Sequence, residues 1–596
     1  MKNVTTNILC SIFLLVAVSV HGAARAERPN IILFVTDDQN QEDISCYGGD
    51  VFTPNLDRLA REGMRFDHAH VPSTVCTPSR YTLLTGRFPG NSYFEPYLAE
   101  FPRNTFAKPA FNVGLEEDNM NIGNVLRMSG YVTGLVGKIH VGPHLKEPAE
   151  FARYGLYDVS KKNGVMDPND PAVIAGWQQN EQWFRQWVMD RGFSWTKNVY
   201  WGNVHGAYPR HNPEWTLEAA LEFIETHKSE PFYLHYTTTL MHGGGRQWNE
   251  SMEHPLVSGA GKLNTLPDVM ASRDEIKRQV EKAGFDPGTT GFTWMDATVG
   301  ALLDKLDELG IADNTLFVFV SDHGTNGKFS LHDHNGTNVP CIMRWPKRIP
   351  AGSVSSSLIQ TTDFVPTFLD VAGVDKPVEY RLDGTSLRPL FSDPKQAIHD
   401  HLYFELGNAR AVRTRNWKYL AIRYDAEQFR RIQSADLRRL PRALAYIGND
   451  KNLSNHLGRR PHFLESDQFY HLTNDPMEMS NLARSPQHAG QLAELKSILA
   501  EELNSQARPF GEFVPGPDLV PIEQVEPFVA KLAGLKVVKR GFEVIDVDTS
   551  KPPVETLSRE QRKKQREERR KQRQMPKQLD SSPQGRLPST RDVRSR

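Results

Sequence analysis

The sequence predicts an α/β fold, a sheet flanked by helices, followed by a smaller α+β domain. Short apolar runs alternate with helical patterns as far as residue 320, and the chain changes near residue 380 to turns and short strand-like pieces. Of its 596 residues, 39% are hydrophobic and 24% charged. That composition excludes a collagen, a disordered chain and a polytopic membrane protein, and the length favours two or more domains.

The first strand is predicted from five consecutive apolar residues, Ile31–Val35, a pattern typical of a buried parallel strand. Similar runs predict three further strands, at Tyr131–Val136, Phe232–Tyr236 and Leu316–Val320. Apolar residues at helical spacing predict helices at Asn55–Glu62 and Met295–Leu309. Ligand sites in such sheets gather at the carboxyl ends of the strands, so functional residues are expected there.

Two of these strands are followed directly by acidic residues. Asp37 and Asp38 follow the first strand, and Asp322 and His323 follow the strand at Leu316–Val320. The same design therefore occurs twice: an apolar strand delivers an acid and a second polar ligand. We expect these two distant segments to form one composite site.

After the main domain, placed at 27–379, the sequence predicts an α+β subdomain at 380–547. Turn residues at Leu382–Ser386 precede strand-like pieces at Ala411–Arg413, Trp417–Ile422 and Gln468–Leu472. The remaining tail, 548–596, is rich in Arg, Lys, Glu and Gln and cannot bury a core. We expect it to be disordered or a solvated helix.

The formal net charge of −1 conceals an asymmetry. Residues 557–596 carry 14 basic and 5 acidic side chains, a net charge of +9, which leaves −10 on the rest of the chain. No global basic field exists for nucleic acid, so nucleic acid is excluded as a partner. The basic tail is either simply solvated or adheres to an acidic glycan or anionic surface.

The N-terminus has the pattern of a cleaved signal peptide, placed at 1–26. Lys2 provides a positive start, Ile8–Val20 is apolar, and Ala24-Arg25-Ala26 is a small-x-small cleavage site. The apolar run is shorter than the ~20 residues that a membrane-spanning helix needs, so the protein is not expected to be transmembrane. An uncleaved anchor is the alternative. We expect a mature chain from Glu27 that is secreted or periplasmic.

The cysteine count then leaves an odd number in an oxidising compartment. Cys10 is removed with the signal peptide, and Cys46, Cys76 and Cys341 remain. At least one of the three must be unpaired or chemically altered.

The segment Cys76-Thr77-Pro78-Ser79-Arg80, followed by Leu84-Thr85-Gly86-Arg87, resembles the sulfatase signature. Pro78 suits the first turn of a helix, and a helix N-terminus favours anions. The resemblance implies an alkaline-phosphatase-like fold with a large mixed, mostly parallel sheet. It also implies that a maturase oxidises Cys76 to formylglycine, whose hydrate is the nucleophile.

The resemblance extends to a metal site. It implies that Asp37, Asp38, Asp322 and His323, together with the converted Cys76, hold one divalent cation. The hard aspartate oxygens favour Ca²⁺, whereas the histidine keeps Mg²⁺ or Mn²⁺ possible.

Further matches imply the remaining site residues. Gly137–Gly142 is similar to a family segment whose Lys138 binds the sulfate and the hydrate and whose His140 is the base. His242 matches a substrate-facing histidine, although the usual following proline is replaced by glycines. Lys328 is the candidate for a last pocket lysine, in a segment one residue longer than the family pattern, so that His332 or His334 could share its role.

The resemblance implies hydrolysis of a sulfate ester. One hydroxyl of the hydrate attacks sulfur and releases the alcohol, and the second then expels sulfate with the help of His140. Arg80, Lys138, His242, Lys328 and the cation supply positive charge. The substrate is expected to be a sulfated glycan, with Tyr93–Asn121 and Lys161–Tyr208 either stacking on sugar rings or belonging to the core. The alternatives are a phosphoester or phosphonate hydrolase, a sulfamidase, and an inactive secreted glycan-binding homologue.

Overall fold

The computed structural model describes residues 28–143, 145, 147–160, 166–202, 211–433, 459–506 and 508–533. The predicted signal peptide and the basic tail lie outside these ranges. Within them, no helix has both the length and the apolar character that a membrane span requires.

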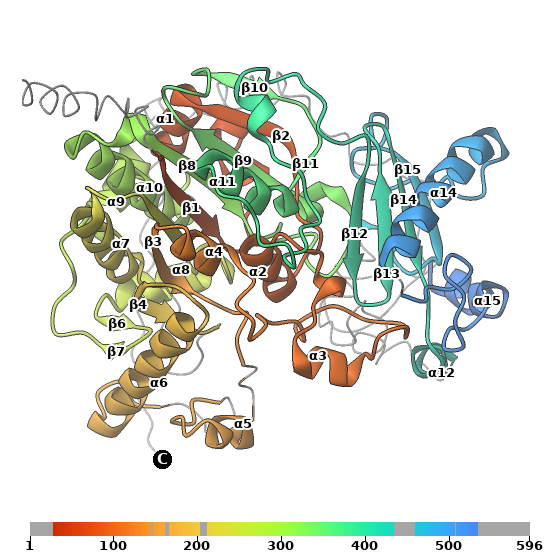
Figure 1. Ribbon diagram of the computed structural model, residues 1–596, viewed down its shortest axis with the longest axis horizontal. Coiled ribbons are helices and arrows are strands. Elements are labelled where there is room, and N and C mark those ends of the chain that lie inside the picture. The colour runs from red at the N-terminus through yellow and green to blue at the C-terminus, as the bar shows by residue number, and fades with distance from the viewer. Residues whose placement is uncertain are drawn as a thin grey trace, which may run out of the picture.

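A large mixed sheet forms the centre of the molecule, in the strand order β10-β2-β9-β8-β1-β5-β3-β4, with β11 paired to β2 (Figure 1). Only the pairings of β9 with β2 and β8 are antiparallel. Its strands are β1 (Asn30–Thr36), β2 (Met64–His70), β3 (Val132–Lys138), β4 (Trp195–Tyr200), β5 (Phe232–Thr237), β8 (Thr315–Ser321), β9 (Asn338–Arg344), β10 (Ser353–Ser355) and β11 (Ile359–Gln360). The predicted mixed, mostly parallel sheet is confirmed.

The sheet is buried on both faces, because successive side chains of a strand point in opposite directions. In β1, Ile31 and Leu33 belong to one core while Ile32 and Phe34 belong to the other. The first core includes residues of α2 (Cys76–Thr85), α3 (Glu95–Glu100), α4 (Ile122–Met128), α5 (Pro148–Arg153), α6 (Pro171–Asp190) and α11 (Phe364–Ala372). The second includes α1 (Pro54–Glu62), α7 (Pro213–His227), α8 (Gly244–Glu253), α9 (Arg273–Lys282) and α10 (Thr290–Glu308).

Helix α10 begins earlier than the sequence predicts, at Thr290 instead of Met295. Gly291, within the first turn, makes room for a neighbouring ring: a Cβ on Gly291 would lie 2.3 Å from Cε3 of Trp248. Close packing thus outweighs the cost of a helical glycine, which is about 1 kcal/mol. Helix α1 begins at Pro54, in agreement with the tolerance of proline in the first turn.

A second, antiparallel sheet of four strands makes up the C-terminal region (Figure 1). It consists of β12 (Leu402–Leu406), β13 (Ala409–Arg413), β14 (Trp417–Ile422) and β15 (Asp467–His471), accompanied by α12 (Ala426–Gln433), α14 (Ala489–Gln506) and α15 (Ile522–Ala533). A small hairpin of β6 (Val257–Ser258) and β7 (Gly261–Lys262) completes the strands of the described residues.

The two regions share a core. Leu402 and Phe404 of β12 pack in one cluster with Val75, the residue before α2, and with Leu331. Tyr380 and Leu390, by contrast, belong to the core of the large sheet. The second sheet therefore lies directly against the segments that lead into the candidate site.

Candidate active site

The carboxyl ends of β1 and β8 lie side by side, because these strands are parallel neighbours with Thr36 opposite Ser321. The residues that follow them meet at once. The Asp38 N–H donates to Asp322 Oδ1 at 3.1 Å, and His323 Nε2 lies 3.1 Å from Asp38 Oδ1. All of these side chains are buried. The structure thus brings the two predicted segments into one cluster.

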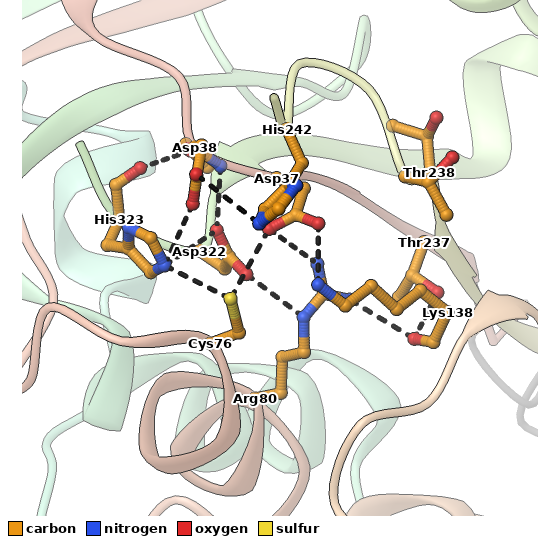
Figure 2. Close-up of polar contacts among 12 residues, drawn as sticks. Asp37, Asp38, Cys76, Arg80, Lys138, Thr237, Thr238, His242, Asp322 and His323 are labelled. Carbon is orange, nitrogen blue, oxygen red and sulfur yellow. Dashed lines mark hydrogen bonds and ion pairs between the residues drawn. The ribbon is translucent and has the colours of Figure 1, made fainter. Parts of the chain in front are cut away.

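Cys76 is the first residue of α2, and its side chain points from the helix N-terminus into this cluster (Figure 2). Its Sγ lies 3.3 Å from His323 Nε2 and 3.5 Å from Asp37 Oδ1. Burial raises the pKa of the Cys76 thiol to about 12, against the opposing effect of Lys138 and Lys328. The N-terminus of α2 adds positive potential at the thiol, a setting that favours an anionic ligand.

Four of the predicted ligands converge closely enough to hold one metal ion. Donor atoms of Asp37, Asp38, Cys76 and His323 all lie within 4.8 Å of one another. A set of buried carboxylate oxygens with one imidazole suits a hard divalent cation. Asp322, the fifth predicted ligand, stands beside this set, and its two oxygens accept from the Asp38 N–H and from Arg80 Nε at 3.0 Å.

Two buried cations border the same carboxylates. Lys138 Nζ donates to Asp37 Oδ2 at 2.5 Å, and Arg80 donates from NH1 to the Lys138 carbonyl at 3.1 Å. Burial alone would raise the pKa of Asp37, but Lys138, His242 and Arg80 bring it well below its usual value. Asp37 is therefore ionised, and the cluster combines negative and positive charge among buried side chains.

Gly137 explains how β3 delivers Lys138 to the site. Its φ is +87°, and a Cβ there would lie 1.7 Å from the Thr237 carbonyl oxygen on β5. The register between β3 and β4 shifts at this residue. Only glycine permits this close approach, and the turn of the backbone directs the next side chain toward Asp37.

Lys328 and His242 complete the group around Asp38. Lys328 Nζ lies 2.8 and 3.0 Å from the two Asp38 oxygens and 3.6 Å from Cys76 Sγ. His242 Nε2 lies 3.8 Å from Asp38 Oδ2, and burial lowers the pKa of His242 to about 3. His332, which on the sequence could share the role of Lys328, packs against the rings of Phe463 and Tyr470. Lys328 is thus the side chain that reaches the thiol.

His140 is placed differently from the other predicted site residues. The remaining nine are linked to one another by hydrogen bonds or ion pairs. The His140 N–H donates to the Trp201 carbonyl at 3.1 Å, and its ring faces Phe111 with centroids 6.1 Å apart. Its assignment as the base stays a prediction.

Several polar residues that support the site carry no motif in the sequence. The Thr237 hydroxyl donates to the Lys138 carbonyl at 2.6 Å, and the Gln39 N–H donates to Ser321 Oγ at 3.0 Å (Figure 2 shows Thr237 beside Lys138). His211 contacts the His242 carbonyl at 3.0 Å. The positions of Ser321 and Thr237 at strand ends are the one sequence signal that could have suggested a role for them. His211 lies outside the predicted strands and motifs, so the sequence gives no signal for it.

Most aromatic residues of the two loops expected near the substrate belong to the core. Tyr97, Trp177 and Phe184 are buried, and Trp201 stacks on Phe184 with centroids 5.3 Å apart. Part of the second loop lies outside the described residues. Phe111, in the first loop, is half-buried and its ring lies beside that of His140. It is therefore the aromatic side chain of this loop that we would test as a sugar contact.

The arrangement suits an oxyanion substrate. A thiol at a helix N-terminus belongs to the metal-ligand set, and Lys138, Lys328 and Arg80 are paired with the carboxylates around it. Such fixed charges stabilise a transition state in which negative charge spreads over several oxygens, and each group typically contributes a few kcal/mol.

Comparison with known proteins agrees with this chemistry. The sulfatase family model matches residues 29–374, and a second model, for the C-terminal part of N-sulphoglucosamine sulphohydrolase, matches residues 321–458. An ulvan-active sulfatase of Formosa agariphila is 27% identical over 83% of this chain and 82% of its own length. An N-acetylglucosamine-6-O-sulfatase of Bacteroides thetaiotaomicron is 25% identical over 76% and 88%.

Solved structures share the fold. One, in complex with its substrate D-glucosamine-2-N,6-O-disulfate, has a TM-score of 0.51 and 21% identity over 81% of this chain and 98% of that one. Another, from work on glycosaminoglycan metabolism by Bacteroides thetaiotaomicron, has a TM-score of 0.53 and 21% identity over 80% and 100%.

Proposed function

This chain belongs to the sulfatase family and is a sulfate ester hydrolase, and we propose that its substrate is a sulfated glycan and its nucleophile is derived from Cys76. The observation that carries the proposal is the position of Cys76: it begins α2 and contacts Asp37, His323 and Lys328 at once. A reactive group at this point meets metal ligands, a cation and a helix N-terminus together.

We assign the residues to roles as follows. Asp37, Asp38 and His323, with Asp322 beside them, would hold one divalent cation, Ca²⁺ in preference to Mg²⁺ or Mn²⁺, which would polarise a sulfate oxygen and lower the pKa of a hydroxyl. Conversion of Cys76 to formylglycine by a maturase, and addition of water to its aldehyde, would supply that hydroxyl. Lys138 and Lys328 then bind the sulfate oxygens, and Arg80 keeps Asp322 in place through its Nε donor.

Two histidines are assigned to the substrate side of the site, where a neutral imidazole can donate a hydrogen bond to the leaving oxygen or accept a proton. His242 lies at the carboxylate side of the cluster, and its lowered pKa keeps the imidazole neutral at pH 7. His140 is assigned to the base that helps to expel sulfate. Proton transfer by a positioned group typically contributes 10²–10⁴-fold.

A glycan substrate is supported by the relatives, an ulvan-active sulfatase and an N-acetylglucosamine-6-O-sulfatase. The predicted signal peptide supports export of the chain, to the periplasm or the medium, where such polymers occur. The decisive experiment monitors sulfate release by the purified, formylglycine-bearing protein from defined sulfated oligosaccharides. Release from none of them, with release from a phosphoester, would overturn the proposal.

Cleavage of an N-sulfate is the second candidate, because the C-terminal match is to N-sulphoglucosamine sulphohydrolase. Glucosamine 6-O-sulfate and glucosamine N-sulfate, offered separately, distinguish the two. We expect the O-sulfated sugar to be the better substrate. An inactive binding protein would release sulfate from neither, and its Cys76 peptide would keep the mass of an unmodified thiol in the natural host.

The metal count provides an independent prediction. We expect one divalent ion per chain by elemental analysis after dialysis, because the described residues offer one converging donor set of this kind. Two ions per chain would favour phosphoryl chemistry, in which paired metals act on the attacking and leaving oxygens.

A further inference from the structure

The loop that carries Lys328 is closed on itself by backbone hydrogen bonds. The Gly324 N–H donates to the Gly336 carbonyl at 2.9 Å, and the Gly327 N–H donates to the Asn335 carbonyl at 2.5 Å. One arm of the loop, 324–330, faces the active site through Lys328. The other arm, 331–337, faces the C-terminal sheet. Because the arms are joined, whatever holds the second arm also positions the first.

Asp333, in the second arm, is held by two cations of the C-terminal sheet. Lys418 Nζ lies 2.5 Å from Asp333 Oδ1, and Arg413 NH1 lies 2.8 Å from Oδ2. Burial would raise the pKa of Asp333, but Arg413 and Lys418 lower it far below its usual value. The Asp333 carboxylate is therefore ionised although it is buried.

The strands themselves require this aspartate. Arg413 on β13 and Lys418 on β14 are directly opposite each other in the antiparallel pair. Opposite residues of such a pair project from the same face, where two like charges repel. Both side chains are at least 97% buried, so the repulsion is unscreened. Asp333 lies between the two cations and offsets part of this repulsion, so its contacts stabilise both the β13–β14 pair and the loop.

Glu478 fixes the same arm from another direction. Its Oε2 accepts the N–H groups of Asp333 at 2.7 Å and of His334 at 3.3 Å. Glu478 is fully buried and has a φ of +56°, in the left-handed region. A donor from Arg460 meets the His334 carbonyl at 2.6 Å. Side chains of the C-terminal region thus fix both donors and acceptors of the backbone at 333–334.

We propose that Lys418 and Glu478 are positioning residues for catalysis: they hold the loop 324–337 so that the Lys328 ammonium stands beside Asp38 and residue 76. The proposal rests on the proposed function in one respect, the role of Lys328 in binding the sulfate. It assigns the C-terminal sheet a part in the reaction that its side chains exert through the loop 324–337.

The test compares Lys418→Met and Glu478→Gln with the control Lys496→Met in the full-length, formylglycine-bearing protein. Lys496 forms a similar ion pair, 2.5 Å from Asp467, within the C-terminal region and away from the loop. We expect kcat/KM to fall about 10- to 100-fold in the two loop variants, because a shift of about 1 Å at a reacting group costs this much. The control should stay within about twofold.

A double-mutant cycle separates positioning from loss of fold. In a Lys328→Ala background, Lys418→Met should change kcat/KM by less than about twofold, because the side chain it positions is gone. A merely structural role would lower activity equally in both backgrounds. Equal losses would overturn the proposal.

Amide hydrogen exchange keeps the test independent of turnover. We expect exchange at 324–337 to accelerate in Lys418→Met and Glu478→Gln, and to stay at the wild-type rate in Lys496→Met. A wild-type protein that releases no sulfate would refute the proposed function alone. Unchanged exchange in both loop variants would refute the positioning of the loop.

Discussion

Replacing Cys76 with serine is expected to lower sulfate release by three orders of magnitude or more, roughly the loss seen when a catalytic nucleophile is removed. Serine could form the first bond to sulfur, but it has no second hydroxyl to expel sulfate and regenerate the enzyme. The fold should be retained, because the residue begins α2 without capping it through its side chain and serine has nearly the same volume.

The measurement is the rate of sulfate release from the preferred glycan, beside the melting temperature and the mass of the peptide that contains residue 76. Cys46→Ser is the matched control: Cys46 is also an unpaired thiol, but it lies outside the cluster of metal-ligand residues. Its activity should be that of the wild type. A Cys76→Ser protein with full activity would refute the mechanism.

The parts of this site that the sequence predicts are those in which one short segment carries the whole signal. An apolar strand followed by Asp37 and Asp38 indicates both the buried strand and the end at which ligands meet. The signature at Cys76 likewise contains its own structural reason, since the residues after it form the first turn of α2. Predictions from such local patterns agree with the folded structure because few other backbone conformations satisfy the pattern.

The parts that it does not predict depend on residues that are distant in the chain. Asp333 and Lys418 are separated by 85 positions, and neither has neighbours that indicate an ion pair. The sequence also allows His332 to share the role of Lys328, whereas the structure places the His332 ring against Phe463. Such contacts depend on how the two sheets pack against each other, and a local sequence pattern does not show that packing.

Replacing Asp38 with asparagine should remove the metal ion and, with it, at least about 99% of the activity, because loss of a charged electrostatic partner in a buried site costs 10²–10³-fold. Asparagine keeps the shape of the side chain but not its charge. Lys328, at 2.8 Å, and His323, at 3.1 Å, would then face a neutral group. The Lys328 ammonium, no longer offset by a carboxylate, would oppose the entry of a divalent cation, and His323 would lose its charged neighbour in the ligand set.

Two measurements check this expectation without relying on turnover. Elemental analysis should find one ion per chain in the wild type and far less in Asp38→Asn. Added Ca²⁺ should raise the melting temperature of the wild type, since a ligand that binds only the folded state stabilises it by RT ln(1 + [L]/Kd). It should raise the melting temperature of the variant much less.

Asp313→Asn is the control, because Asp313 is exposed and precedes β8, at the end of the sheet away from the site. If Asp38→Asn bound one ion as tightly as the wild type, Asp38 would serve to position Lys328 and not to hold the metal, and the cation would have to be assigned to Asp37, Asp322 and His323.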